Sequence, residues 1–194
     1  MATGYNPFGG WGNSEAPPPS IFGALPYPQS SAPSPTLADR AIFVFTDYNP
    51  SILNCTIVDN RARTVFYIST ETTPRYTFVK DRDGRNLGVI EWQTHPSVEI
   101  RGIVPKQEVR SWLALSPDAR SRVMTVQNAR YAWAPSGSHI LLYTTTSSVP
   151  QVLGKVSKTA STVTLELSAA ALELGLLECA IVATLLMQSG RNID

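Results

Sequence analysis

Residues 168–190 read SAAALELGLLECAIVATLLMQSG, a segment that is apolar almost all the way round when drawn as a helix. Ser168 is a favoured helix N-cap, and Gly190 is a favoured residue just after a last helical turn. We therefore predict one helix over about residues 169–189. A helix with so little polar surface must be surrounded by protein or by lipid.

A position in lipid is disfavoured by the length of the apolar run. A membrane span needs about 20 apolar residues, whereas this run extends only from Cys179 to Met187 and is interrupted by Thr184. Glu173 and Glu178 lie in the wider window, and an acidic side chain near the centre of a span costs about 2.5–3.5 kcal/mol. We expect no transmembrane span and interpret the helix as the core of a structure built by the preceding residues.

Composition and charge exclude some classes of protein. The chain has 194 residues, a net charge of +1 and 43% hydrophobic residues. This length and hydrophobic content fit one folded domain with a tail, and the charge argues against nucleic-acid binding. Cys55 and Cys179 lie in apolar runs, which favours buried reduced thiols. The first residues do not resemble a secretory signal. We expect a cytoplasmic protein, with peripheral membrane association as the alternative location.

Residues 1–38 form a tail of distinct composition. They hold eight of the 15 prolines and five of the 12 glycines of the chain. This composition predicts disorder with polyproline character. Five aromatic residues are scattered through the tail, so it is either a docking arm for a protein partner or a simple tether.

Residues 39–190 are predicted to form a β domain. Short runs of β-branched and aromatic residues alternate with turn residues such as Asp83-Gly84, a favoured hairpin pair. The segment 109–115 fits either a strand or a short helix. The other predicted strands cover residues 41–45, 53–58, 64–69, 75–80, 86–93, 98–103, 122–126, 129–133, 139–144, 151–156 and 162–167.

About twelve strands with one polar face suggest an antiparallel sheet, and closure into a barrel would remove its exposed edges. Eight strands already form a barrel whose interior is filled by side chains, so about twelve leave room for a helix about 10–12 Å across. We therefore predict a closed antiparallel barrel around the buried C-terminal helix.

Five segments of the β domain form a recognisable series. They are TDYNPSILNCTIVD (Thr46–Asp59), VFYIST (Val65–Thr70), GVIEWQTHPSVEIRG (Gly88–Gly102), YAWAPSGSHILLY (Tyr131–Tyr143) and TLELSAAALELGLLECAIVATLLM (Thr164–Met187). Over about residues 41–189 this series resembles a fungal family of unknown function, whose domain is similar to the Tubby C-terminal, LURP-one-related and phospholipid-scramblase barrels. The resemblance implies a barrel of about twelve strands around a hydrophobic helix. Tubby domains bind phosphoinositides, but their lipid-binding lysine and arginine have no matching residues here.

Basic residues cluster near the predicted Asp83-Gly84 turn. Four cations could converge there on a phosphate or phospholipid headgroup, although Asp81 and Asp83 partly cancel their charge. A solvated turn of mixed charge is the competing interpretation. The candidate headgroup-binding residues are Arg75, Lys80, Arg82 and Arg85. A second basic face could form from Arg110, Arg120, Arg122 and Arg130, again with a solvated surface as the competing interpretation.

Catalytic and metal-binding patterns are not recognisable in the sequence. His95 and His139 are the only histidines and lack neighbouring ligand patterns, so we predict no metal, cofactor or catalytic residue. Glu91, Glu173 and Glu178 are the carboxylates expected to be enclosed, most simply as ion pairs. We predict a non-enzymatic binding or scaffold module that recognises phospholipid headgroups at a membrane surface. The alternative is an interaction protein that acts through its N-terminal tail.

Overall fold

A computed structural model describes residues 40–73, 75–145 and 149–194. The predictions of disorder and of partner docking for residues 1–38 lie outside the described residues. The described part is mainly β and contains thirteen strands with three short helices. The strands are β1 Arg40–Thr46, β2 Cys55–Asp59, β3 Thr64–Thr70, β4 Tyr76–Asp81, β5 Asn86–Glu91, β6 Ser97–Ile100, β7 Val104–Glu108, β8 Leu113–Leu115, β9 Arg122–Val126, β10 Ala129–Ser136, β11 His139–Thr144, β12 Val152–Lys158 and β13 Val163–Ser168.

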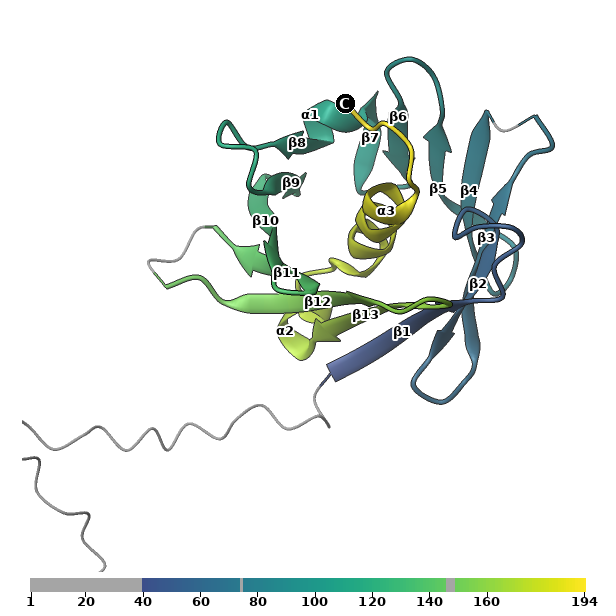
Figure 1. Ribbon diagram of the computed structural model, residues 1–194, viewed down its shortest axis with the longest axis horizontal. Helices are drawn as coiled ribbons and strands as arrows, with labels where there is room; N and C mark the ends of the chain where they lie inside the picture. Colours follow the sequence, from purple (N-terminus) through teal and green to yellow (C-terminus); the bar gives the residue numbers. More distant parts are fainter. Residues whose placement is uncertain (1–39, 74, 146–148) are drawn as a thin grey trace, which may run out of the picture. The chain divides into compact units, whose positions relative to one another are not determined.

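All thirteen strands belong to one antiparallel sheet, as predicted. Its order is β7-β6-β5-β4-β3-β2-β1-β13-β12-β11-β10-β9-β8, so β1 and β13 pair in the middle. Alternation within β1 places Phe43 and Phe45 in the core and leaves the intervening residues partly exposed. The sheet curves strongly, and Figure 1 shows its two ends turning toward each other.

Two parts of the sheet differ from the prediction. The ambiguous segment 109–115 forms both of the elements considered, the helix α1 (Val109–Trp112) and then β8. The strand β7 was not predicted, because Pro105 and Lys106 interrupt its apolar pattern. Its position at the edge explains why this sequence is tolerated, since a proline in an edge strand need not break a ladder of hydrogen bonds.

The predicted closure of the sheet is wrong. The edge strands β7 and β8 are not paired with each other. The helix α1 lies between them instead (Figure 1), where Val109 and Trp112 are buried. The Val109 backbone N–H donates to the Pro96 carbonyl at 2.8 Å, and the Trp112 indole N–H donates to the Thr125 carbonyl at 3.1 Å. We call this unpaired boundary, filled by α1, the seam.

The predicted single helix over residues 169–189 is also wrong. It is divided into α2 (Ala169–Glu173) and α3 (Leu177–Gln188). Gly175 has a φ of +66°, and the N–H groups of Gly175 and Leu176 donate to the carbonyls of Leu172 and Ala171. This pair of bonds is a Schellman motif, which ends α2. The predicted caps are present: Ser168 accepts from the Ala171 N–H at 3.2 Å, and Gly190 follows α3 with a φ of +70°.

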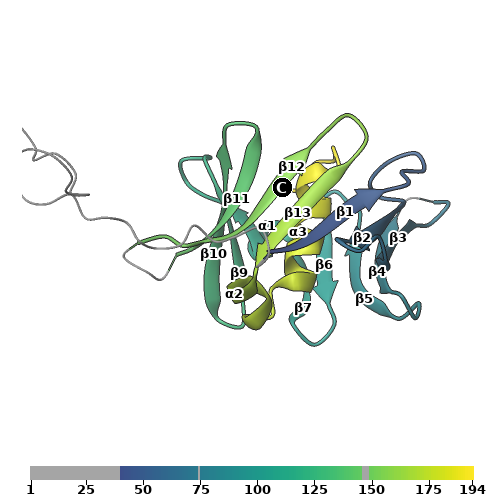
Figure 2. The same ribbon diagram turned by 90° about the horizontal axis from the view of Figure 1, so that it is seen from below.

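The helix α3 lies on the concave side of the sheet (Figures 1 and 2). Eight consecutive residues, 179–186, are at most 1% exposed. The one hydroxyl among them, on Thr184, donates to the Ala180 carbonyl at 2.7 Å. The expected enclosure of acidic residues holds for Glu91, which is 5% exposed. It is wrong for Glu173, which is exposed, and Glu178 is only partly covered.

The two cysteines are free and buried. Burial raises the pKa of the Cys55 and Cys179 thiols to about 12. Both side chains therefore stay protonated and act as small apolar core residues. In the described part of the chain, no helix has the length and apolar character that crossing a bilayer would require.

Candidate functional site

The four predicted headgroup-binding residues lie on or beside β4. Within this strand Thr77 and Val79 face the interior and are at most 1% exposed, so the alternate residues face outward. Lys80 belongs to the outward set, Arg75 directly precedes the strand, and Arg82 and Arg85 follow it in the turn to β5. Four cations are therefore distributed along one strand.

Aromatic rings separate the cations on the outer surface of β4. The rings of Tyr76 and Phe78 stack with their centroids 6.3 Å apart and an interplanar angle of 28°. The Arg75 guanidinium lies 5.6 Å from the Tyr76 ring centroid, and the Lys80 ammonium lies 5.7 Å from that of Phe78. We call the row Arg75, Tyr76, Phe78 and Lys80 the β4 stripe. Each cation gains electrostatic attraction from the ring beside it.

The turn after β4 gathers two of the predicted arginines but not the third. Asp81 accepts from the backbone N–H groups of Asp83 and Arg85, each at 2.9 Å, and Gly84 has a φ of +80°. This turn brings Arg82 and Arg85 to the same carboxylate, Asp83, at 3.9 and 3.3 Å. Arg75 lies at the other end of a strand about 20 Å long. The single cluster expected from the sequence is therefore divided between the two ends of β4.

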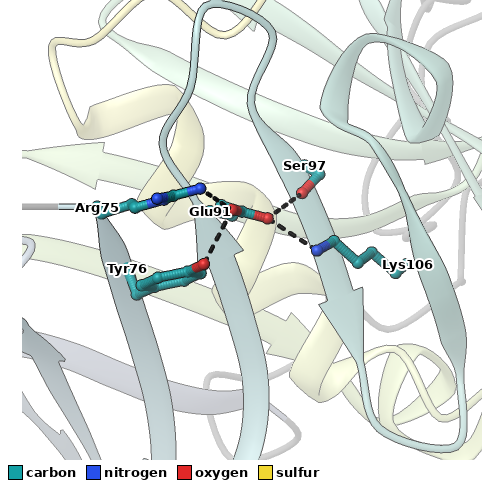
Figure 3. Close-up of polar contacts among 5 residues, drawn as sticks. All are labelled: Arg75, Tyr76, Glu91, Ser97 and Lys106. Carbon is teal, nitrogen blue, oxygen red and sulfur yellow. Dashed lines mark hydrogen bonds and ion pairs between the residues drawn. The ribbon is translucent and has the colours of Figure 1, made fainter.

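Arg75 belongs instead to a network around Glu91, the last residue of β5 (Figure 3). One carboxylate oxygen of Glu91 accepts from the Tyr76 hydroxyl at 2.9 Å and from the Arg75 guanidinium at 3.3 Å. The other accepts from the Lys106 ammonium at 2.8 Å and from the Ser97 hydroxyl at 3.5 Å. Glu91 thus connects side chains on or beside four neighbouring strands, β4 to β7.

The Glu91 network keeps its carboxylate ionised. Hydrogen bonds from Lys106, the largest influence, and from Tyr76 lower the pKa of Glu91 to about 2. A group with this pKa holds no proton to donate near neutral pH, so it is unsuited to general acid catalysis. The arrangement instead fixes Arg75 and Lys106 on the outer surface, where their side chains remain 62% and 61% exposed.

The second predicted basic face is divided too. Arg110 pairs with Glu108 at 2.6 Å, and Arg130 lies on the exposed side of β10. Arg120 and Arg122 instead line a pocket of about 370 Å³ beside the C-terminal end of α3, together with Arg191. Its apolar walls include Leu115, Trp133, Pro135, Ile140, Leu186 and Met187. We call it the α3-end pocket.

The α3-end pocket was missed by reasoning from the sequence. Its lining comes from the strands β8 to β11, from the turn between β8 and β9, from α3 and from the residues after α3. No local motif connects these segments, and only the order of the strands brings them together. The visible signal was limited to Arg120 and Arg122, which lie in and directly after the turn between β8 and β9.

Comparisons with known proteins place the chain in a family. Residues 50–192 match the model of a family of unknown function, DUF6593. No curated protein matches the chain. An X-ray structure of a protein from Arabidopsis thaliana is similar, with 10% sequence identity and a TM-score of 0.44, over 75% of this chain and 91% of that one. The chain therefore belongs to the family of unknown function DUF6593.

Proposed function

We propose that this protein is a non-enzymatic binding module that docks on membranes by recognising the headgroups of anionic phospholipids. The observation that carries the proposal is the β4 stripe, continued by Arg82 and Arg85 in the following turn. These two turn arginines have side chains 79% and 69% exposed, so a ligand can reach them.

The chemistry of the stripe suits the boundary between a membrane and water. Arginine binds phosphate oxygens through two parallel hydrogen bonds, and aromatic side chains favour the headgroup level of a bilayer. Tyr76 and Phe78 would lie at this level while the neighbouring cations contact the headgroups. Because the rings and the Glu91 network already hold Arg75 and Lys80 in place, docking orders few additional side chains.

The charge balance predicts weak binding that depends on salt. Arg75, Lys80, Arg82 and Arg85 supply four positive charges, and Asp81 and Asp83 remove two, which leaves two. Near an anionic membrane each basic residue contributes about 1 kcal/mol, so the net attraction is about 2 kcal/mol. This corresponds to a preference of about 30-fold for anionic over neutral vesicles.

Sedimentation with vesicles tests the proposal. The full chain should bind phosphatidylcholine vesicles that contain phosphatidylserine more strongly than pure phosphatidylcholine vesicles, and high salt should remove the difference. The double variant Arg82→Gln/Arg85→Gln removes two positive charges, so it should weaken the binding to anionic vesicles roughly 30-fold. The double variant Arg130→Gln/Lys158→Gln removes the same charge from the exposed ends of other strands and serves as the control.

Two results would contradict membrane recognition by β4. One is an absence of binding to anionic vesicles at low salt. The other is an equal loss of binding in the control variant, which would show an effect of total charge rather than of this surface.

The relation to Tubby-like domains belongs to the same proposal. A strongly curved antiparallel sheet with its C-terminal helix α3 on the concave side supports this relation (Figure 2). The lipid-facing residues proposed here are nevertheless those of β4, chosen from their placement in this chain.

A further inference from the structure

The α3-end pocket has a charge pattern that selects for an anion. Three arginines line it, and no carboxylate is among the described residues of its lining. Two of them are already engaged. Arg122 donates to both carboxylate oxygens of Asp194, at 2.9 and 2.6 Å, and the Arg191 guanidinium lies 4.6 Å from the centroid of the Trp92 ring.

Arg120 is the cation at the rim that a ligand can recruit. It is exposed in the turn between β8 and β9, where its backbone N–H donates to Asp118 at 3.2 Å. Its guanidinium forms no hydrogen bond or ion pair with the residues that the structure describes. A guanidinium offers five donors and no acceptor, so it suits a carboxylate or a phosphate.

Trp133 provides a second, independent observation. It is 1% exposed and forms part of the pocket wall, and its indole Nε1 has no hydrogen-bond partner within the described part of the chain. A buried N–H group is normally paired, because leaving it unpaired costs about 1–3 kcal/mol. An unpaired donor on a residue of the pocket wall favours a ligand that carries acceptors.

The size and the walls of the pocket limit what else the ligand carries. At about 30 Å³ for each water-sized group, a volume of 370 Å³ holds about twelve such groups. A methylene group is close to water in size, and the side chains of Leu186, Met187 and Ile140 offer it apolar contact. Apolar walls with a few polar groups that fix orientation are typical of small-molecule sites.

We propose that the α3-end pocket binds a single-chain aliphatic carboxylate of about ten to twelve carbons. One carboxylate oxygen contacts Arg120 at the rim and the other accepts from the Trp133 indole N–H, while the aliphatic chain lies against the apolar side chains at the end of α3. This site shares no residue with the β4 stripe, so the proposal does not depend on membrane docking.

Calorimetry with the full chain tests the ligand class. Dodecanoate, kept below its micelle concentration, should bind one site. Dodecanol keeps the chain without the charge, and hexanoate keeps the charge on a shorter chain, so both should bind more weakly. An absence of dodecanoate binding, or equal binding of dodecanol and dodecanoate, would overturn the proposal.

Nuclear magnetic resonance tests the position of the ligand. The sequence holds four tryptophans, and the indole N–H signal of Trp133 is assigned by its loss in Trp133→Phe. Dodecanoate should shift this signal more than that of Trp112, whose indole N–H is already bonded to Thr125. An unchanged Trp133 signal at saturating dodecanoate would place the ligand elsewhere and refute the site.

Substitution of Arg120 tests the role of its charge. Arg120→Gln should weaken dodecanoate binding about two- to fivefold, the range expected of an exposed ion pair, and leave dodecanol binding unchanged. Arg130→Gln is the matched control, because Arg130 is exposed on β10 and faces away from the buried side that carries Trp133. Equal affinities for dodecanoate in wild type and Arg120→Gln would contradict the assigned contact.

Discussion

The ammonium nitrogen of Lys106 lies 2.8 Å from Oε2 of Glu91, and this contact joins the edge strand β7 to β5 across β6. Lys106 thus reaches over the neighbouring strand to a carboxylate that is 5% exposed. The charge of Lys106 also interrupts the apolar pattern of β7, which is one reason why this strand was not predicted from the sequence. Because Glu91 must be ionised to accept the bonds of this network, we expect the stability of the sheet edge to depend on pH.

Acid should destabilise the protein through Glu91. The folded-state pKa of about 2 lies below the usual value near 4.3, so the stabilisation is complete above pH 4.3 and is lost as the pH falls toward 2. Thermal unfolding of Glu91→Gln should show a lower Tm at pH 7 and a smaller decrease between pH 5 and 3 than wild type. Glu173→Gln, at an exposed position, is the control and should behave as wild type. A parallel decrease in wild type and Glu91→Gln would refute this role.

Thr77 should be a sensitive core position because it relays hydrogen bonds. Its hydroxyl accepts from the Trp92 indole N–H at 2.8 Å and lies 2.8 Å from the Thr70 hydroxyl, which donates to the Leu53 carbonyl at 2.6 Å. Thr77→Val keeps the shape but leaves the indole N–H unpaired, so the free energy of unfolding should fall by about 1–3 kcal/mol.

Urea denaturation measures this difference. Thr125→Val, at an exposed position of β9, is the matched control and should stay within about 0.5 kcal/mol of wild type. Equal stability of the two variants would show that the relay contributes nothing.

Gly154 and Gly88 should differ in their tolerance of a methyl group. A Cβ on Gly154 would lie 2.8 Å from Leu167 Cδ2 and 2.9 Å from the Glu166 carbonyl oxygen, and backbone cannot easily move aside. On Gly88 the nearest atom is Val182 Cγ2 at 3.3 Å. Gly154→Ala should therefore lower the free energy of unfolding by about 1–3 kcal/mol, and Gly88→Ala should lower it less. Chemical denaturation of both variants gives the order, and a reversed order would contradict the packing described.

Gly175 should be required at the break between α2 and α3. With its φ of +66°, an alanine there would cost about 1–2 kcal/mol. Gly175→Ala should lower the Tm, whereas Leu174→Ala, at an exposed neighbouring position, should change it little. If Gly175→Ala raised both the Tm and the helical circular dichroism, a continuous helix over 169–189 would be the more stable arrangement.

Local patterns were sufficient to predict most strands, both helix caps and the Asp83-Gly84 turn. Each depends on residues adjacent in sequence, as in the capping of α2 by Ser168. The break at Gly175 was visible in principle, since a glycine inside a predicted helix lowers the confidence of that assignment. The break was missed because the residues on both sides of Gly175 are mostly apolar and continue the helical pattern.

The features that depend on distant residues could not be predicted. Whether β7 pairs with β8 is decided by the path of the whole sheet and by α1, not by either strand alone. The same holds for the candidate site. Arg75 is close in sequence to Arg82, but an extended strand separates them, whereas Arg120 and Arg191 are distant in sequence and line the same pocket.

The seam gives this fold a preferred place to open. Separating any other pair of neighbouring strands breaks a ladder of main-chain hydrogen bonds, while parting β7 from β8 breaks none. The helix α1 closes this boundary, with the Val109 N–H bonded to Pro96 and the Trp112 indole N–H bonded to Thr125. Two side-chain contacts near the end of the chain add to it, Arg191 over Trp92 and Asp194 on Arg122. Both are electrostatic contacts that salt weakens. We therefore expect the backbone amides beside the α3-end pocket to exchange their hydrogens faster than those of the central strands, at a rate that rises with ionic strength.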